Sequence, residues 1–501
     1  MKNSIIITLL ALLMAAPLFA QTDSVRLAEY LKVEQTDARQ WIERYQRDID
    51  AYIDENRRAD DLSCDALFIG SSSINMWQTL HEDMAPMKVI RRSYGGSSIR
   101  DMLYNYDVIA RGYNPNCIVM YVENDLCGCK EEITEYEAFD LFRVFAQRIQ
   151  RDYPGVPFYI VSFKPSFARW DQVEKQKITN YLLKSYADNT PDVEFIDIAT
   201  AMYDKQGNLR EDIFLNDRLH LNATGYEIWT SIIKPRIMQH HNKNLFYYKV
   251  GDYEVYLLSE GQGPGNIDIL LGASQEMMNQ AIPNKAFPTA TNTFLLKTPD
   301  GYYILIDTGY GSKLFNNLSD MGIKPEEISS ILLTHTHGDH TGGLLKDGER
   351  AFGNAAIGMS REELEFWKQN DNPKNKAIWE SYTIHTFEGK DINEVMLNDE
   401  VPIQPVKAFG HTPGHSAILI SSKGERLMIW GDLTHAMAIQ MPYPQVATTY
   451  DSDPDMAIQS RLKILAFVAE HKIPIAGMHI PFPAIGTIEA DGEGYIFRAK
   501  N

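Results

Sequence analysis

Three histidines and an aspartate stand close together in the run His-Thr-His-Gly-Asp-His at residues 335–340. A lone histidine is usually structural, but imidazoles and a carboxylate clustered in this way are typical of a metal site. His335 and His337 alternate at the end of an apolar run and therefore point the same way. Asp339 and His340 follow in the next turn and can serve a second ion. The cluster thus predicts a site for two metal ions.

Further metal ligands are expected at the ends of later strands. His411 lies in a tight turn, Asp432 ends an apolar run with a carboxylate that can bridge two cations, and His479 ends another segment. His415, in the same turn as His411, is expected to be structural and to hold the turn. Histidine and carboxylate ligands suit zinc, with iron or manganese as alternatives.

The first half of the chain contains the parts of a serine hydrolase. Ser72 lies in a Gly-Ser-Ser-Ser run after the first apolar strand, although such runs usually only cap a helix. Asp217 and His220 are three residues apart, so the carboxylate can orient an imidazole that serves a serine. Gly96 and Asn124 follow the second and third strands and can offer N–H donors to an oxyanion.

In chain order these blocks resemble the GDSL or SGNH hydrolases over about residues 60–240. The resemblance implies Ser72 as nucleophile, His220 as base, Asp217 as its orienter, and Gly96 and Asn124 with the Ser72 N–H in the oxyanion hole. The sequence departs from the family at Ser71, where an aspartate is usual, and at Val122, where a glycine is usual. Neither position is chemically required. The resemblance further implies a flavodoxin-like three-layer α/β domain and an acyl ester substrate.

The second half, about residues 246–501, resembles the metallo-β-lactamase-fold hydrolases. The resemblance implies one ion on His335, His337 and His411, a second on Asp339, His340 and His479, and Asp432 bridging them. The stretches 431–440 and 479–486 look like the methyl parathion hydrolase group. An αβ/βα sandwich and two divalent ions, zinc above all, are implied. Antibiotic hydrolysis is disfavoured, because true β-lactamases of this fold lack a bridging aspartate at this place.

The elements that carry these residues follow two patterns. A helix is expected over 36–56, and the first half then alternates helical segments with strands, which indicates a parallel, doubly wound sheet. The strands are expected at 66–69, 89–90, 117–122, 157–163 and 193–198. Near residue 243 the pattern changes to one strand over 247–258, a glycine-rich loop over 261–265, and a hairpin of 293–296 with 302–306. We therefore expect domains at 21–242 and 243–501.

The first twenty residues are predicted to be a secretory signal peptide. Lys2 precedes an apolar run over 5–13, and Ala20 offers a small residue at the cleavage point. A membrane anchor is the alternative, but the run is shorter than the ~20 residues of a span. The mature chain is therefore expected to begin at Gln21, in the periplasm or outside the cell, without stable membrane insertion.

Composition limits the partners. The 501 residues include 48 Lys plus Arg and 67 Asp plus Glu, a formal net charge of −19, which argues against binding nucleic acid. Four cysteines, which an exported protein can pair in three ways, give no basis for a function: Cys64, Cys117, Cys127 and Cys129. The oligomeric state stays open.

Together these observations predict an exported hydrolase with two catalytic domains. The N-terminal domain is expected to be a serine esterase or deacylase, and the C-terminal domain a dinuclear metallohydrolase of esters, lactones or phosphotriesters. Two hydrolases on one chain suggest one small-molecule or acylated glycan or lipid substrate. The alternative is a single catalytic metallohydrolase whose N-terminal domain only binds the glycan or lipid.

Overall fold

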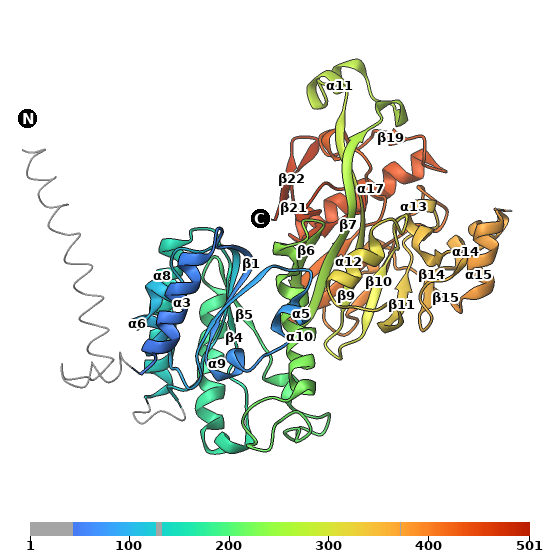
Figure 1. Ribbon diagram of the computed structural model, residues 1–501. Helices are drawn as coiled ribbons and strands as arrows, with labels where there is room; N and C mark the ends of the chain where they lie inside the picture. Colours follow the sequence, from blue (N-terminus) through green and yellow to red (C-terminus); the bar gives the residue numbers. More distant parts are fainter. Residues whose placement is uncertain (1–43, 127–132, 371, 501) are drawn as a thin grey trace, which may run out of the picture. The chain divides into compact units, whose positions relative to one another are not determined.

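The computed structural model describes residues 44–126, 133–370 and 372–500 (Figure 1). The chain divides into two compact units, Met1–His241 and Asn242–Asn501. The predicted signal peptide, the first part of the predicted helix over 36–56, and Cys127 and Cys129 lie outside the described residues. Within the described ranges, no helix has the length and apolarity that a membrane crossing would need.

The N-terminal unit is built on one parallel sheet in the order β2-β1-β3-β4-β5. The strands are β1 (Ser63–Gly70), β2 (Val89–Ser93), β3 (Asn114–Tyr121), β4 (Phe158–Val161) and β5 (Val193–Ile196). This is the flavodoxin-like strand order. The prediction of a parallel α/β domain is therefore confirmed.

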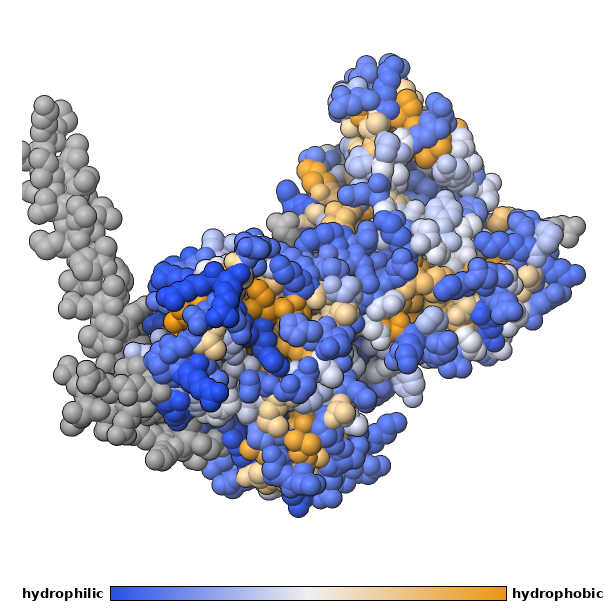
Figure 2. Space-filling model, in the orientation of Figure 1, coloured by the Kyte–Doolittle hydropathy of each residue, from blue (hydrophilic) through white to orange (hydrophobic). Residues whose placement is uncertain are grey.

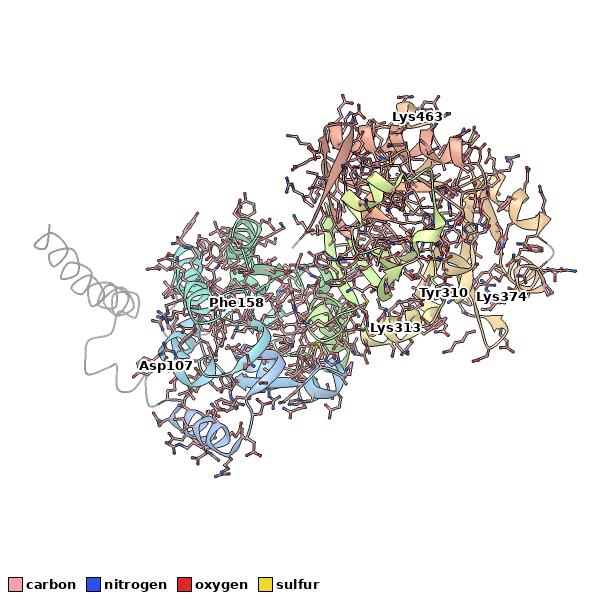
Figure 3. All side chains as sticks on the ribbon, turned by 90° about the horizontal axis from the view of Figure 1, so that it is seen from above. Asp107, Phe158, Tyr310, Lys313, Lys374 and Lys463 are labelled. Carbon is pink, nitrogen blue, oxygen red and sulfur yellow. The ribbon has the colours of Figure 1, made fainter. Side chains whose placement is uncertain are left out.

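Helices cover both faces of this sheet (Figure 1). They are α3 (Gln46–Arg58), α4 (Ser72–Asn75), α5 (Leu80–Met84), α6 (Ile99–Tyr104), α7 (Tyr106–Ile109), α8 (Glu135–Asp152), α9 (Val173–Asp188) and α10 (Ala223–Ile237). One face buries α3, α6, α8 and α9 side chains in a core that includes Phe158, labelled in Figure 3. On the other face, Trp229 of α10 packs edge-on against Tyr121 of β3 and Trp77.

The end of β1 brings the serine-rich turn against the neighbouring strand. Gly70 pairs with Tyr121 of β3. A Cβ on Gly70 would lie 2.6 Å from the Tyr121 carbonyl oxygen and 2.4 Å from Ile74, so only glycine fits. After Ser71, Ser72 is the first residue of α4, at the carboxyl edge of the sheet, where open α/β sheets place their ligands.

The C-terminal unit is a sandwich of two sheets. The first has the order β15-β14-β11-β10-β9-β7-β6, and the second β16-β17-β18-β20-β21-β22. The strands of the first are β6 (Leu245–Val250), β7 (Tyr253–Gly265), β9 (Phe287–Lys297), β10 (Tyr303–Ile306), β11 (Ile328–Leu332), β14 (Ala356–Ser360) and β15 (Ile384–Phe387). Those of the second are β16 (Ile403–Lys407), β17 (Ser416–Ser422), β18 (Glu425–Ile429), β20 (Ile475–Ala476), β21 (Ile485–Asp491) and β22 (Gly494–Ala499).

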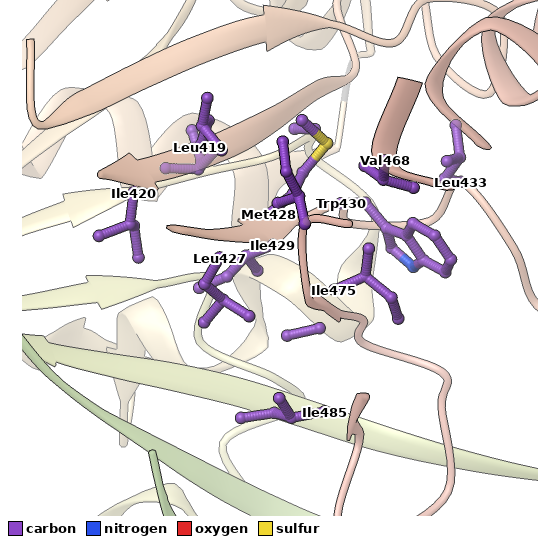
Figure 4. Packing of buried hydrophobic residues seen from close by; sticks show 14 of the residues in the cluster. Leu419, Ile420, Leu427, Met428, Ile429, Trp430, Leu433, Val468, Ile475 and Ile485 are labelled. Carbon is purple, nitrogen blue, oxygen red and sulfur yellow. The ribbon is translucent and has the colours of Figure 1, made fainter. Parts of the chain in front are cut away.

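One apolar core joins the inner faces of both sheets. It combines side chains of β7, β9 and β10 with those of β17 and β18, among them Leu419, Leu427 and Ile429, and with Trp430 directly after β18 (Figure 4). The helices of the unit are α11 (Gln275–Ala281), α12 (Leu314–Asp320), α13 (Gly338–Thr341), α14 (Arg361–Gln369), α15 (Pro373–Ser381), α16 (Met437–Gln440) and α17 (Pro454–Glu470). This αβ/βα arrangement is the predicted one.

Two expectations about strands near residue 250 are wrong. The single strand expected over 247–258 is a hairpin of β6 and β7, because Gly251 adopts a φ of 58° and turns the chain. The loop expected over 261–265 belongs to β7, because these residues still pair with β9. The segment between β7 and β9 carries α11 and packs on Ala436, Ile439 and Val446. Apolar residues gather beside α11 on the surface (Figure 2).

Cys64 and Cys117 are both buried. They lie on the neighbouring strands β1 and β3, but the register pairs Cys64 with Pro115 and Cys117 with Ala66. No disulfide joins the two residues.

Candidate active sites

The first group of potential metal ligands comes from three separate loops of the C-terminal unit. His335 and His337 follow β11, His411 follows β16, and Asp432 follows β18. The Nε2 atom of His411 lies 3.2 Å from Nε2 of His335 and 3.1 Å from Nδ1 of His337. Nitrogen lone pairs that converge at this distance repel one another unless a cation lies between them. This geometry is typical of a metal site.

The second group shares Asp432 with the first and adds Asp339, His340 and His479. The Asp432 carboxylate lies 3.2 Å from Nε2 of His340 and 3.0 Å from Nε2 of His479. It also lies 3.4 Å from Nε2 of His411 in the first group. One carboxylate therefore faces both groups, as a bridging ligand must.

Two buried atoms, which lie 3.2 Å from each other, favour a cation at this site. His340 Nε2 and Asp432 Oδ1 are buried and make no hydrogen bond within the described part of the chain. Burying such groups without compensation is costly, and a metal ion would satisfy both. The predicted pair of divalent ions is therefore supported by two ligand groups whose histidines and carboxylates suit zinc.

The pKa values of the histidines also favour a metal ion at this site. Burial and the neighbouring His340 lower the pKa of His335, and burial and His411 lower the pKa of His337 to about 4, so both rings are neutral. Burial opposes a charge on His340 too, but the carboxylates of Asp432, Asp307 and Asp339 outweigh it and raise the pKa of His340. These carboxylates thus favour positive charge at the position of the second ion.

Acceptors behind the histidines set the direction of each ring. Three rings have Nδ1 at hydrogen-bond distance from an acceptor: His340 from Asp307 (2.7 Å), His411 from Asp451 (2.9 Å) and His479 from the Ala290 carbonyl (2.8 Å). Each such bond fixes the tautomer and leaves Nε2 as a ligand. Asp307 also accepts hydrogen bonds from the Thr334 N–H and hydroxyl.

Glu363 ties two ligand-bearing loops together. One carboxylate oxygen accepts from the N–H and hydroxyl of Thr336, which lies between His335 and His337. The other accepts from the Thr412 hydroxyl and the Gly414 N–H, in the turn that carries His411. A buried carboxylate with four donors holds the loops at a fixed separation.

His415 and His435 have distinct environments. Burial lowers the pKa of His415 to about 3, and its ring joins the Ala408 carbonyl to the Asp432 N–H, which agrees with the expected structural role. His435 is not a surface residue: it is 5% exposed, its Nε2 lies 3.0 Å from Asp432, and its ring stacks on His479.

A cavity of about 770 Å³ opens over the two ligand groups. Asp339, Asp432 and His479 line it, together with Phe287, Tyr310 and Tyr450. Glu260 accepts hydrogen bonds from the backbone N–H groups of Tyr310 and Lys313, whose side chains Figure 3 labels, and so fixes the loop after β10. The volume suits a small-molecule substrate.

The N-terminal unit brings the predicted serine, histidine and aspartate together. Ser72 Oγ lies 2.9 Å from Nε2 of His220, and Nδ1 of His220 lies 2.6 Å from Asp217. The other Asp217 oxygen accepts from the N–H groups of Leu219 and His220. Nucleophile, base and orienter are thus linked in the order that acyl transfer requires.

The two predicted oxyanion-hole residues lie at the same sheet edge. Gly96 follows β2 and adopts a φ of 76°, which favours glycine. Asn124 follows β3, is 3% exposed, and donates from Nδ2 to the Ser97 carbonyl, at 2.7 Å. Its amide orientation is therefore set by the segment next to Gly96.

Several residues of these sites were not identified from the sequence. Nothing local in the sequence indicated that Asp307 and Asp451 pair with His340 and His411. Glu363 opens a helix and reads as an ordinary first-turn carboxylate. Arg169, which contacts Asn124 in the serine site, lies in a short irregular helix without a motif. Covariation between sequences is the signal that could have found them.

Comparison with known proteins places the second unit in a family. The profile of the Metallo-beta-lactamase superfamily matches residues 286–472. The C-terminal unit contains a metallo-beta-lactamase superfamily domain. The metal-ligand candidates of this domain from His335 to Asp432 lie inside the matched range, and His479 lies just beyond it.

Individual relatives match only parts of the chain. An N-acyl homoserine lactonase of a Bacillus species is 27% identical over 157 residues, 26% of this chain and 58% of the relative. The anti-Pycsar protein Apyc1 of Saccharibacillus brassicae is 46% identical over 57 residues, 11% of this chain and 23% of the relative. The chain thus spans less than two thirds of these curated relatives.

Solved structures also match part of the chain. The dizinc quorum-quenching lactonase AidC is 25% identical and covers 52% of this chain and 98% of its own, with a TM-score of 0.46. A putative platelet activating factor of Streptococcus pneumonia is 21% identical and covers 40% of this chain and 97% of its own, with a TM-score of 0.36.

Proposed function

We propose that the metallo-beta-lactamase domain hydrolyses lactones, esters or phosphotriesters at a dinuclear metal centre, with lactones tested first. The observation that carries the proposal is Asp432, which faces two ligand groups at the base of a cavity. The partial match to an N-acyl homoserine lactonase supports the choice of lactones. Methyl parathion hydrolase-like stretches around Asp432 support phosphotriesters as the second class.

In this centre, two bound divalent ions would acidify a water molecule and stabilise the oxyanion that forms on the attacked carbonyl or phosphoryl group. His335, His337 and His411 would hold one ion, and Asp339, His340 and His479 the other, with Asp432 between them. Asp307 and Asp451 fix the tautomers of two of these histidines. Tyr310 and Tyr450 at the cavity wall are placed to contact the substrate.

A substrate panel with metal control tests this proposal. Full-length protein is assayed with lactones, aryl esters and phosphotriesters before and after treatment with a chelator, and after return of zinc. We expect hydrolysis of at least one class to disappear with the metal and to recover with zinc. The proposal fails if fully metallated protein hydrolyses none of the three classes, or if the chelator leaves every rate unchanged.

We propose a second activity for the N-terminal unit: a metal-independent serine esterase or deacylase of the SGNH type. The linked distances from Ser72 through His220 to Asp217 favour it. Ser72 would attack the acyl carbon while His220 takes the hydroxyl proton and later returns it to the leaving group. Acylated glycans or lipids are the substrates we infer for an exported chain.

Serine substitutions separate this activity from a purely binding role. Ser72→Ala should abolish ester hydrolysis that survives the chelator, whereas Ser73→Ala should retain most of it, because Ser73 is buried beneath the turn. A folded protein whose Ser72 does not react with a fluorophosphonate probe would instead favour the alternative, a glycan- or lipid-binding unit beside one metallohydrolase.

We also propose that the chain is exported, with cleavage after Ala20, and that residues 21–242 and 243–501 are its functional domains. N-terminal sequencing of protein from its native host tests export. A mature chain that retains Met1 and stays in the cytosol would contradict it.

A further inference from the structure

The serine site is supported by a buried cluster of charged side chains. Glu123, directly before Asn124, is 3% exposed and contacts two cations through the same oxygen: Lys164 Nζ at 3.3 Å and Arg169 Nη1 at 3.0 Å. Burial opposes ionisation of Glu123, but Lys164 and Arg169 outweigh it and lower the pKa of this carboxylate. The cluster is therefore charged under ordinary conditions.

Only one of the two cations also contacts the oxyanion-hole amide in the described structure. Arg169 Nη2 donates to Asn124 Oδ1 at 2.7 Å, while Lys164 Nζ donates to the Leu219 carbonyl at 2.9 Å. The guanidinium thus forms a fork, with one arm on Glu123 and the other on Asn124. An arginine fork suits such a two-point contact, which a lysine ammonium cannot reproduce.

The contact constrains the Asn124 amide from both ends. Its oxygen accepts from Arg169, and one of its N–H groups donates to the Ser97 carbonyl. An amide held in this way cannot rotate end for end without losing both bonds, so its second N–H keeps a fixed direction. A charge-assisted bond to the oxygen also polarises the amide and makes its N–H groups stronger donors.

The segment that carries Arg169 is itself attached to the loop of the catalytic base. The Ala168 N–H donates to the carbonyl of Arg218, between Asp217 and His220, and the Arg218 guanidinium lies 4.1 Å from the centre of the Phe167 ring. Inside its 3₁₀ helix Arg169 leaves helical geometry, with φ of −128°. The backbone of Arg169 therefore departs from the conformation of its helical neighbours.

We propose that Arg169 is a positioning residue of the serine site, which orients and polarises the Asn124 amide for the oxyanion of acyl transfer. The proposal rests on the serine esterase activity proposed above. A purely structural ion cluster is the competing explanation, and it predicts the same importance for Lys164 as for Arg169.

A double-mutant cycle on the full-length chain distinguishes the two explanations. Arg169→Met is compared with Lys164→Met, because each removes one positive charge from the same Glu123 oxygen and leaves that carboxylate facing the other cation. Both are combined with Asn124→Ala, and chelator-resistant ester hydrolysis and melting temperature are measured for every variant.

We expect Asn124→Ala to lower kcat by about 10²- to 10³-fold. Arg169→Met should lower kcat by about 10- to 100-fold, with KM changed little. The hydrogen bond that it removes stabilises the transition state and contributes little to substrate binding. In the Asn124→Ala background the same substitution should cost less than about threefold. The loss from Lys164→Met should instead have the same size with and without the Asn124 side chain.

Two results would overturn the inference in different ways. If Arg169→Met lowers kcat equally in both backgrounds, or if it acts only on melting temperature, Arg169 is structural while the esterase proposal stands. If the wild type shows no hydrolysis that depends on Ser72, the esterase proposal fails and the inference fails with it. Should Arg169→Met not fold, Arg169→Lys, which keeps the charge but not the fork, is measured in the same cycle.

Discussion

Replacing Asp432 with alanine separates a bridged pair of ions from two independent sites. The carboxylate lies within 3.0 to 3.7 Å of nitrogen atoms of four ligand histidines, two in each ligand group, and 3.0 Å from Nε2 of His435. The substitution leaves His335, His337 and His411 to one ion, and Asp339, His340 and His479 to the other. Each ion thus loses one ligand, and the water that would contact both ions loses its fixed position.

The size of the effect follows from these contacts. Changing a side chain that hydrogen-bonds to a metal ligand typically lowers metal affinity by about 10- to 100-fold, and removing a ligand lowers the affinity at least as much. Metal content should therefore fall from about two ions per chain toward one after dialysis. Hydrolysis at this centre should fall by about 10²-fold or more, because both the nucleophile and the stabilisation of charge are weakened.

Asp339→Ala is the matched control, since Asp339 belongs only to the second ligand group. It should weaken the second ion and leave the affinity of the first unchanged, whereas Asp432→Ala should weaken both. Metal content is measured by plasma mass spectrometry across buffered zinc concentrations, with hydrolysis measured on the same samples. An Asp432→Ala protein that keeps two ions and full activity would refute the bridging role, and a wild type that binds only one ion would refute the dinuclear centre.

Three further predictions follow from ionisable groups of the two units. Asp307→Asn should lower affinity for the second ion by about 10- to 100-fold while sparing the first, because an amide has one acceptor oxygen and cannot accept from the Thr334 N–H on one side and from the Thr334 hydroxyl and His340 on the other; zinc titration calorimetry checks this. For Asp217, burial opposes ionisation, but hydrogen bonds from His220 and Leu219 prevail and lower the pKa from 3.8 to about 2. Its contribution to stability is then fully present above pH 3.8 and lost as the pH falls through 2, so wild type and Asp217→Asn should differ in melting temperature at pH 6 and converge toward pH 2; a constant difference would contradict this. Burial raises the pKa of Cys64 to about 12, so the native protein should resist iodoacetamide at Cys64, and mass spectrometry should find Cys64 and Cys117 modified only after denaturation.

The sequence was informative where a site is built from close neighbours. His335, His337, Asp339 and His340 fall within six residues, so their chemistry could be predicted without knowing the fold. The parallel sheet of the N-terminal unit was predictable for a similar reason, since buried strands of such sheets are short apolar runs separated by helical patterns.

Turn geometry and distant partners could not be predicted in this way. The apolar pattern continues from β6 into β7, and only the positive φ of Gly251 separates the two strands. Glu363 supports the loops of His335 and His411 from a helix, across 27 residues to Thr336 and 49 to Thr412. Contacts of that kind depend on how strands are ordered in the sheet, which a local pattern does not contain.

Both proposed reactions place negative charge on an oxygen, and the two units differ in the source of positive charge. Among the described residues that line the cavity of the metallo-beta-lactamase domain, none is lysine or arginine, while Glu260, Asp339 and Asp432 are acidic. An oxyanion formed there needs the metal ions, so a chelator should remove the activity completely. In the N-terminal unit, Arg169 and Lys164 lie within 3.3 Å of Glu123 beside Asn124, so the charge belongs to the chain itself. Activity that survives the chelator and depends on Arg169 through Asn124 is therefore the signature that distinguishes the serine site.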